Sequence, residues 1–168
     1  MNAPSIGVAQ TPVSSTGNSE APSKGGDLTP MFSGMEKDCG QSNEGIGQTM
    51  RWLMVENGKP PSKGDAPGAI RSSMGSNRVK IKDQGDFWDI AVALTNATYH
   101  GLPVKEIARW SGKGNGINGI ALVFSVPMGT VKKTIGMPTV GKNNEETMPM
   151  LSSNKKTNNA MLVCDFSD

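Results

Sequence analysis

The spacing of hydrophobic positions along the chain predicts several short strands and two adjacent helices. Arg78–Lys82 alternates strictly, so that Val79 and Ile81 face one way and three basic side chains face the other. This is the pattern of a half-buried strand with a basic outer face. Apolar runs or hairpin spacing predict four further strands: Thr49–Glu56, Gly119–Val126, Thr130–Ile135 and Ala160–Phe166.

The helical signal lies between these strands. Asp86 can cap a helix over Asp86–Thr98, whose apolar residues recur at intervals of three and four positions. A second, shorter helix is expected to begin at Pro103 and to end near Gly112. Strands in runs around two adjacent helices predict an α+β fold: a small, mostly antiparallel sheet packed with the two helices.

The first part of the chain has a different composition. Residues 1–45 are rich in Ser, Gly, Pro, Thr, Asn and Ala and show no sustained period. Such a segment buries too little apolar surface to offset its ordering entropy, so we predict a disordered N-terminal arm. Residues 46–168 form the expected α+β domain. No signal-peptide pattern and no run of about 18 apolar residues appears, so any membrane contact is expected to be peripheral.

Charge and cysteine content add little specificity. Residues 1–45 hold two basic and five acidic residues, and residues 46–168 hold fifteen basic and ten acidic ones. A mildly basic body permits contact with phosphate or anionic lipid without requiring it. Two cysteines, Cys39 and Cys164, are too few for a disulfide scaffold or a thiolate zinc site, and they indicate a reducing compartment.

No segment predicts an active site. Gly114–Gly119 matches G-x-G-x-x-G, but a helix is expected before it and a strand after it, the reverse of the dinucleotide-binding order. His100 is the only histidine and stands in a turn. No nucleophile signature and no His/Cys cluster accompanies it. We therefore expect a non-enzymatic protein with no catalytic residues, no cofactor and no metal.

Two alternatives concern nucleic acid. Pro103–Gly112 is similar to the first helix and turn of a helix-turn-helix regulator, which would make this a DNA-binding protein. The recognition helix would then fall on Lys113–Gly119, whose glycines each cost a helix about 1 kcal/mol. A small coat or nucleic-acid-packaging protein shares most of the same features.

One segment resembles a known family. Ser76-Asn77-Arg78, the basic strand, the aromatic-bearing segment Phe87–Thr98, Tyr99 with Gly101, and the closing Ser111-Gly112 follow one another in order. This order resembles the matrix proteins of rhabdoviruses, in particular the plant-infecting, cytorhabdovirus-like branch. The resemblance covers roughly residues 70–126.

The resemblance implies a structural protein. Such a protein self-associates as an oligomer or lattice and links the viral nucleocapsid to the inner face of the envelope. It would lie in the virion between nucleocapsid and envelope, and in host cytoplasm and at membranes, with no small-molecule substrate. The candidate contacts with nucleocapsid or anionic lipid are Arg78, Lys80, Lys82, Lys132 and Lys133. Met128 and Met137 are the candidate contacts with membrane or a neighbouring subunit.

Overall fold

The fold is one antiparallel sheet of six strands with short helices on one side. The computed structural model describes residues 26–41, 43–139 and 148–168. The strand order is β1-β2-β3-β4-β6-β5, and every neighbouring pair is antiparallel. The strands are β1 (Val79–Asp83), β2 (Phe87–Tyr99), β3 (Leu102–Gly112), β4 (Asn118–Pro127), β5 (Pro149–Ser153) and β6 (Asn159–Asp165).

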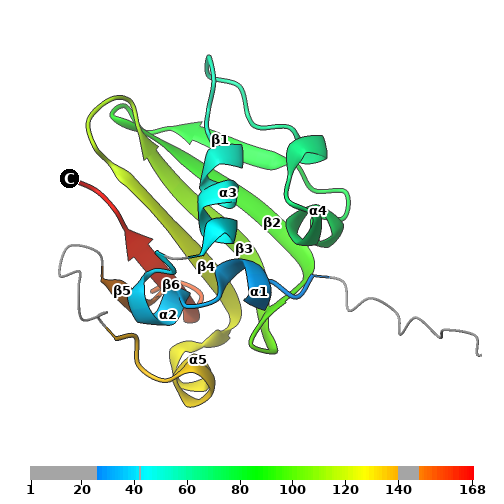
Figure 1. Cartoon of the computed structure of the whole chain (residues 1–168), viewed down its shortest axis with the longest axis vertical. Helices are drawn as coiled ribbons and strands as arrows, with labels where there is room; N and C mark the ends of the chain where they lie inside the picture. The colour runs from blue at the N-terminus through cyan, green and yellow to red at the C-terminus, as the bar shows by residue number, and fades with distance from the viewer. Residues whose placement is uncertain (1–25, 42, 140–147) are drawn as a thin grey trace, which may run out of the picture.

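The helices are short and gather over one face of this sheet. They are α1 (Thr29–Phe32), α2 (Met35–Asp38), α3 (Glu44–Trp52), α4 (Gly68–Ser73) and α5 (Met128–Ile135), with a 3-10 turn at Lys63–Asp65. Figure 1 shows α1 to α4 in front of the strands, with α5 at the lower end where β4 finishes. The α+β class and the antiparallel sheet of the sequence analysis are confirmed.

The two longest strands form a tight hairpin. Tyr99 pairs with Leu102, leaving only His100 and Gly101 in the loop. Both loop residues have positive φ, 49° and 78°. A two-residue loop with two left-handed residues matches the right-handed twist of the strands that it joins.

The two predicted helices are therefore wrong: Asp86–Thr98 falls on β2, and the segment from Pro103 to Gly112 falls on β3. In β2 the inward residues Ile90, Val92 and Leu94 alternate as a strand requires. Alanines occupy the outward positions between them, so both faces of the strand are apolar in sequence. A continuous apolar run rich in alanine satisfies the helical spacing equally well.

Two predicted strands are also wrong. Most of Thr49–Glu56 belongs to α3 or the turn after it, and Thr130–Ile135 lies in α5. The start of α3 is fixed by Asn43, whose side-chain oxygen accepts a hydrogen bond from the backbone N–H of Gly45 at 2.8 Å. The strands predicted over Arg78–Lys82, Gly119–Val126 and Ala160–Phe166 correspond to β1, β4 and β6.

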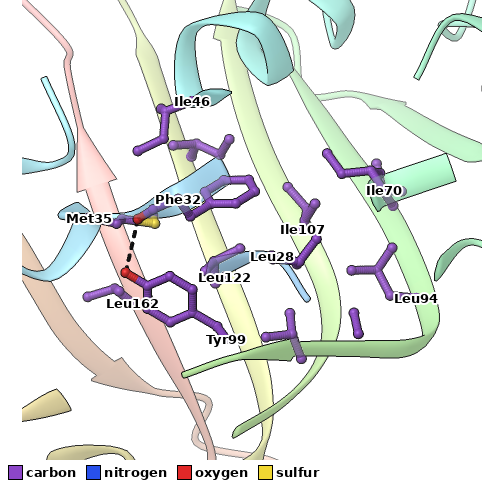
Figure 2. Packing of buried hydrophobic residues seen from close by; sticks show 14 of the residues in the cluster. Leu28, Phe32, Met35, Ile46, Ile70, Leu94, Tyr99, Ile107, Leu122 and Leu162 are labelled. Atoms are coloured by element: carbon purple, nitrogen blue, oxygen red, sulfur yellow. Dashed lines mark hydrogen bonds between the residues drawn. The ribbon is translucent and has the colours of Figure 1, made fainter. Parts of the chain in front are cut away.

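The core lies between the sheet and the helices. One row of paired residues crosses all six strands and is apolar throughout: Val79, Val92, Ile107, Leu122, Leu162 and Leu151. Figure 2 shows Phe32 and Leu28 packed over the middle of this face, with Ile46 above and Ile70 beside them.

The folded body begins earlier than the sequence predicted. Leu28, Phe32 and Met35 are fully buried, so at least residues 26–41 belong to the body rather than to a disordered arm. Short helices separated by glycines leave no sustained period, which is why the sequence concealed them. Within the predicted arm, residues 1–25 and 42 lie outside the described residues.

A disulfide joins the N-terminal segment to the sheet. Cys39, directly after α2, is bonded to Cys164 on β6, with the two Cα atoms 5.6 Å apart. Both cysteines are buried. The bond closes a loop across 125 positions of sequence. Disulfides persist in oxidising environments, so this pairing argues against the reducing compartment expected from the cysteine count.

Candidate interaction surface

The sheet face opposite the helices is the main surface left open by the described residues. Because successive side chains of a strand point to opposite faces, the residues that alternate with the core rows point to this side. We call it the open face. Its members are Lys80, Lys82, Phe87, Asp89, Ala91, Ala93, Glu106, Ala108, Trp110, Gly119, Ala121, Val123, Met161, Val163, Asp165, Met150 and Ser152.

The middle of the open face is apolar and built from small side chains. One paired row runs Ala91, Ala108, Ala121, Val163 and Met150 across five strands. Ala121 is buried, yet it is not part of the core cluster beneath the helices. Small residues at the centre allow another surface to approach the sheet closely.

One aromatic ring lies across this face. Trp110 pairs with Gly119, and a Cβ placed on Gly119 would lie 2.0 Å from two ring carbons of Trp110. The indole therefore occupies the space above the glycine backbone instead of standing away from the sheet. This arrangement needs glycine because any other residue would displace the ring.

The open face carries charges of both signs around its apolar centre. Lys80 and Lys82 stand at the β1 margin, Asp89 and Glu106 lie on the next two strands, and Asp165 lies on β6. Partial burial raises the pKa of Glu106; Asp89 raises it further, whereas Lys105 and Lys80 lower it. A surface of this composition is not strongly attractive to either cations or anions.

The structure divides the basic residues singled out by sequence into two groups. Arg78, Lys80 and Lys82 are exposed at β1, one edge of the sheet. Lys132 and Lys133 are exposed on α5, which contacts β4, β5 and β6 in the other half of the sheet. The five residues therefore do not form one continuous basic surface.

The two methionines singled out by sequence have different environments. Met128 begins α5 and packs against the core, whereas Met137 is 61% exposed. Met150, on the open face, is 51% exposed and was not singled out by sequence. The other residues of the open face were not singled out by sequence either, because they are recognisable only once β2 and β3 are assigned as strands.

The only histidine takes part in a structural contact. The Tyr99 hydroxyl lies 2.9 Å from the Phe32 carbonyl oxygen and also contacts the Glu36 carboxylate. Nε2 of His100 lies 3.7 Å from Oε1 of Glu36. Burial raises the pKa of Tyr99, and Glu36 raises it further. These contacts tie the end of the β2–β3 hairpin to α1 and α2.

The remaining motifs fall in ordinary structural positions. Gly114–Gly119 occupies the turn between β3 and β4 and the start of β4, with positive φ at Gly114 and Gly116. The segment required for a helix-turn-helix is strand β3. Across residues 26–41, 43–139 and 148–168, no group of three or more His, Cys, Asp or Glu side chains is placed to hold a metal ion. In the same part of the chain, no helix is long and apolar enough to cross a membrane.

Comparison with known proteins gives no relative: no protein-family model, no curated protein and no solved structure matches this chain significantly.

Proposed function

We propose that this chain is a non-enzymatic structural protein that self-associates through the open face of its sheet. The observation that supports the proposal is the apolar row from Ala91 to Met150, which no described helix covers. An uncovered apolar sheet face is costly in water, and sheet-on-sheet packing is a common way in which proteins bury one.

The charge pattern favours a second copy of the chain as the occupant. A two-fold interface brings the same patch from both copies together, so the patch has to accept itself. The open face satisfies this condition because it carries lysines at one margin and carboxylates elsewhere. A two-fold axis parallel to the strands would bring the Lys80–Lys82 margin of one copy over the β5–β6 margin of the other, which carries Asp165.

The size of the face fits a modest dimer. Six strands at about 4.8 Å spacing and three rows of outward residues give a patch of roughly 24 by 14 Å before side-chain margins are added. Stacking two such patches buries on the order of 1,000 Å² in total, near the lower limit for a specific interface. We therefore expect a dimer that dissociates on dilution.

Sedimentation velocity at protein concentrations of about 1–100 µM tests the proposal. This concentration range suits an interface of this size. Wild type should shift from monomer to dimer across the series. Ala108→Lys places a charge at the centre of the face and should keep the chain monomeric. Gln48→Lys, on the exposed surface of α3, is the matched control and should behave as wild type. A wild-type chain that is monomeric throughout would refute the proposal.

The viral matrix role is the more specific form of this proposal and remains a prediction from the sequence resemblance. Flotation with anionic and with neutral vesicles at physiological salt tests its membrane part. Selective flotation with anionic vesicles that is lost when Arg78, Lys80 and Lys82 become Ser would support it. Failure to float with either would refute it. The buried disulfide argues against long residence of the folded protein in a reducing host cytoplasm.

A further inference from the structure

We propose that the outer edge of β1 binds an extended, acidic segment of a partner protein as a seventh strand. This site uses the backbone edge of β1, whereas the open-face interface uses the flat surface of the sheet; the two share Lys80 and Lys82. Among the described residues, β1 pairs with β2 only, so its other edge is an end of the sheet. An edge strand presents backbone N–H and C=O groups that can pair with an added strand.

The side chains of β1 define which sequence that added strand should have. Lys80 and Lys82 point to the open side, whereas Val79 and Ile81 point to the core side. Ile81 remains partly exposed. Directly paired residues in neighbouring strands lie about 4.5–5.5 Å apart and interact. A segment that alternates acidic with apolar residues would place its carboxylates beside the two lysines and its apolar side chains beside Val79 and Ile81.

A groove continues this edge at the start of the strand. A hollow of about 520 Å³ lies between Pro60–Gly64 and Ser76–Val79. Lys63 and Arg78 line it, and no acidic residue does. The only acidic residue of β1 is Asp83, whose carboxylate is already engaged by the Lys113 ammonium at 2.5 Å. The β1 edge and its groove therefore both carry positive charge.

The same charge rejects a second copy of this chain at the edge. In an antiparallel β1–β1 pairing, lysines of the two copies would face one another, and like charges in neighbouring strands are destabilising. Edge lysines commonly prevent such self-pairing. Here they also select for an acidic strand. Anionic membranes and nucleic acids could contact the lysines, but neither would use the strand edge or Ile81.

Fluorescence anisotropy tests the proposal with a labelled peptide of about nine residues containing the pattern Glu-Val-Glu-Ile-Glu, long enough to span a five-residue strand. The full-length protein should bind it. A peptide of the same composition with its Glu residues grouped together should bind at least about tenfold more weakly, because half of its contacts are lost. At protein concentrations below those at which wild type self-associates, wild type and the Ala108→Lys variant should bind alike, since the strand edge lies within one copy.

Two double charge reversals locate the site. Lys80→Glu with Lys82→Glu should weaken binding by at least about tenfold, because two favourable cross-strand pairs become unfavourable. Lys132→Glu with Lys133→Glu makes the same change in net charge on α5 and should leave binding within about twofold. Amide exchange of Val79–Asp83 should slow when the patterned peptide is added.

Three results would overturn the proposal. The first is equal binding of the patterned and grouped peptides, which would indicate non-specific charge attraction. The second is equal loss of binding in the two double variants. The third is binding of phosphatidylserine vesicles or a single-stranded oligonucleotide, dependent on Lys80 and Lys82, without binding of the peptide.

Discussion

Trp110 lies over Gly119 on the neighbouring strand, so close that a single added carbon would meet the ring at 2.0 Å. The glycine therefore determines where the largest side chain of the open face rests. Replacing Gly119 by Ala should push the indole off the sheet and lower the free energy of unfolding by about 1–3 kcal/mol, as overpacking does. Urea denaturation followed by far-ultraviolet circular dichroism measures this change.

Gly129→Ala is the matched control for Gly119→Ala. Gly129 lies in α5, and nothing stands within 4 Å of the Cβ that it would gain. Alanine is the better helix former, so this variant should be neutral or more stable by up to about 1 kcal/mol. Equal destabilisation by the two substitutions would contradict the role assigned to the close contact at Gly119.

The Cys39–Cys164 bond should make a large contribution to stability. Opening a loop of 125 residues releases chain entropy equivalent to roughly 4–5 kcal/mol in the unfolded-state model. Cys39→Ser and Cys164→Ser should therefore unfold at much lower urea concentration than wild type, and to a similar extent. Reductant should destabilise wild type and leave both variants unchanged. A wild-type chain that contains free thiols after oxidative refolding would contradict the bond.

Tyr99 should resist deprotonation. It is the only tyrosine in the chain, so the absorbance of tyrosinate reports on it alone. Burial raises the pKa of Tyr99 above its ordinary value, and the nearby Glu36 raises it further. The stability that this neutral hydroxyl contributes is complete below about pH 10 and is lost as the pH rises above that value. Tyrosinate should appear only as the protein unfolds, and near pH 10 in denaturant.

Self-association should strengthen as the pH falls below neutrality. Burial raises the pKa of Glu106 on the open face, and stacking a second copy would remove more water from it. That loss of water would raise the pKa of Glu106 further, so the associated state binds the proton more readily than the monomer does. Dimer stability is therefore greatest at acidic pH and falls as the pH rises through that pKa.

Glu106→Gln tests this pH dependence. Glutamine is neutral at every pH, so the variant should dimerise more tightly at pH 7 and vary less with pH in sedimentation equilibrium. Lys105, Asp89 and Lys80 are the charged groups that act on Glu106. Unchanged pH dependence in the variant would contradict a role for Glu106 in the interface.

The parts of the fold that sequence predicted are those whose side chains alternate in polarity. β1 was recognisable because apolar Val79 and Ile81 alternate with lysines. β2 was not, because its outward positions are alanines. β3 was not, because Arg109 occupies a core-side position between Ile107 and the end of the strand. Alternation of apolar and polar residues is the main sequence signal of a strand. The alanines of β2 and Arg109 of β3 both interrupt it.

Arg109 also shows why a buried polar residue misleads sequence analysis. It is 5% exposed, and burial lowers its pKa to about 10. Its guanidinium donates to the Asn118 side chain at 2.8 Å and to the Gly119 carbonyl at 3.4 Å. These partners are brought together only by the β3–β4 pairing. Arginines are mostly exposed, so residue type alone does not predict a buried side chain at this position.

The open face could be recognised from sequence only if β2 and β3 were assigned as strands. Lys80 and Lys82, at the margin of the open face, were recognisable from sequence, but the apolar residues at its centre were not. The signal that could have found them is the Tyr99–Leu102 segment, where His100-Gly101 suits a two-residue hairpin loop. Taking that loop as a hairpin would have made strands of both flanking segments and exposed the row of alanines.

Intermolecular nuclear Overhauser effects report whether two copies of the chain meet through the open face. In an equimolar mixture of labelled and unlabelled chains, we expect contacts between copies at the methyl groups of Ala108, Val163 and Met161. Core methyls of Ile107 and Leu122 should show none. Intermolecular contacts confined to the helix side, or no contacts at concentrations where the chain sediments as a dimer, would refute self-association through the open face.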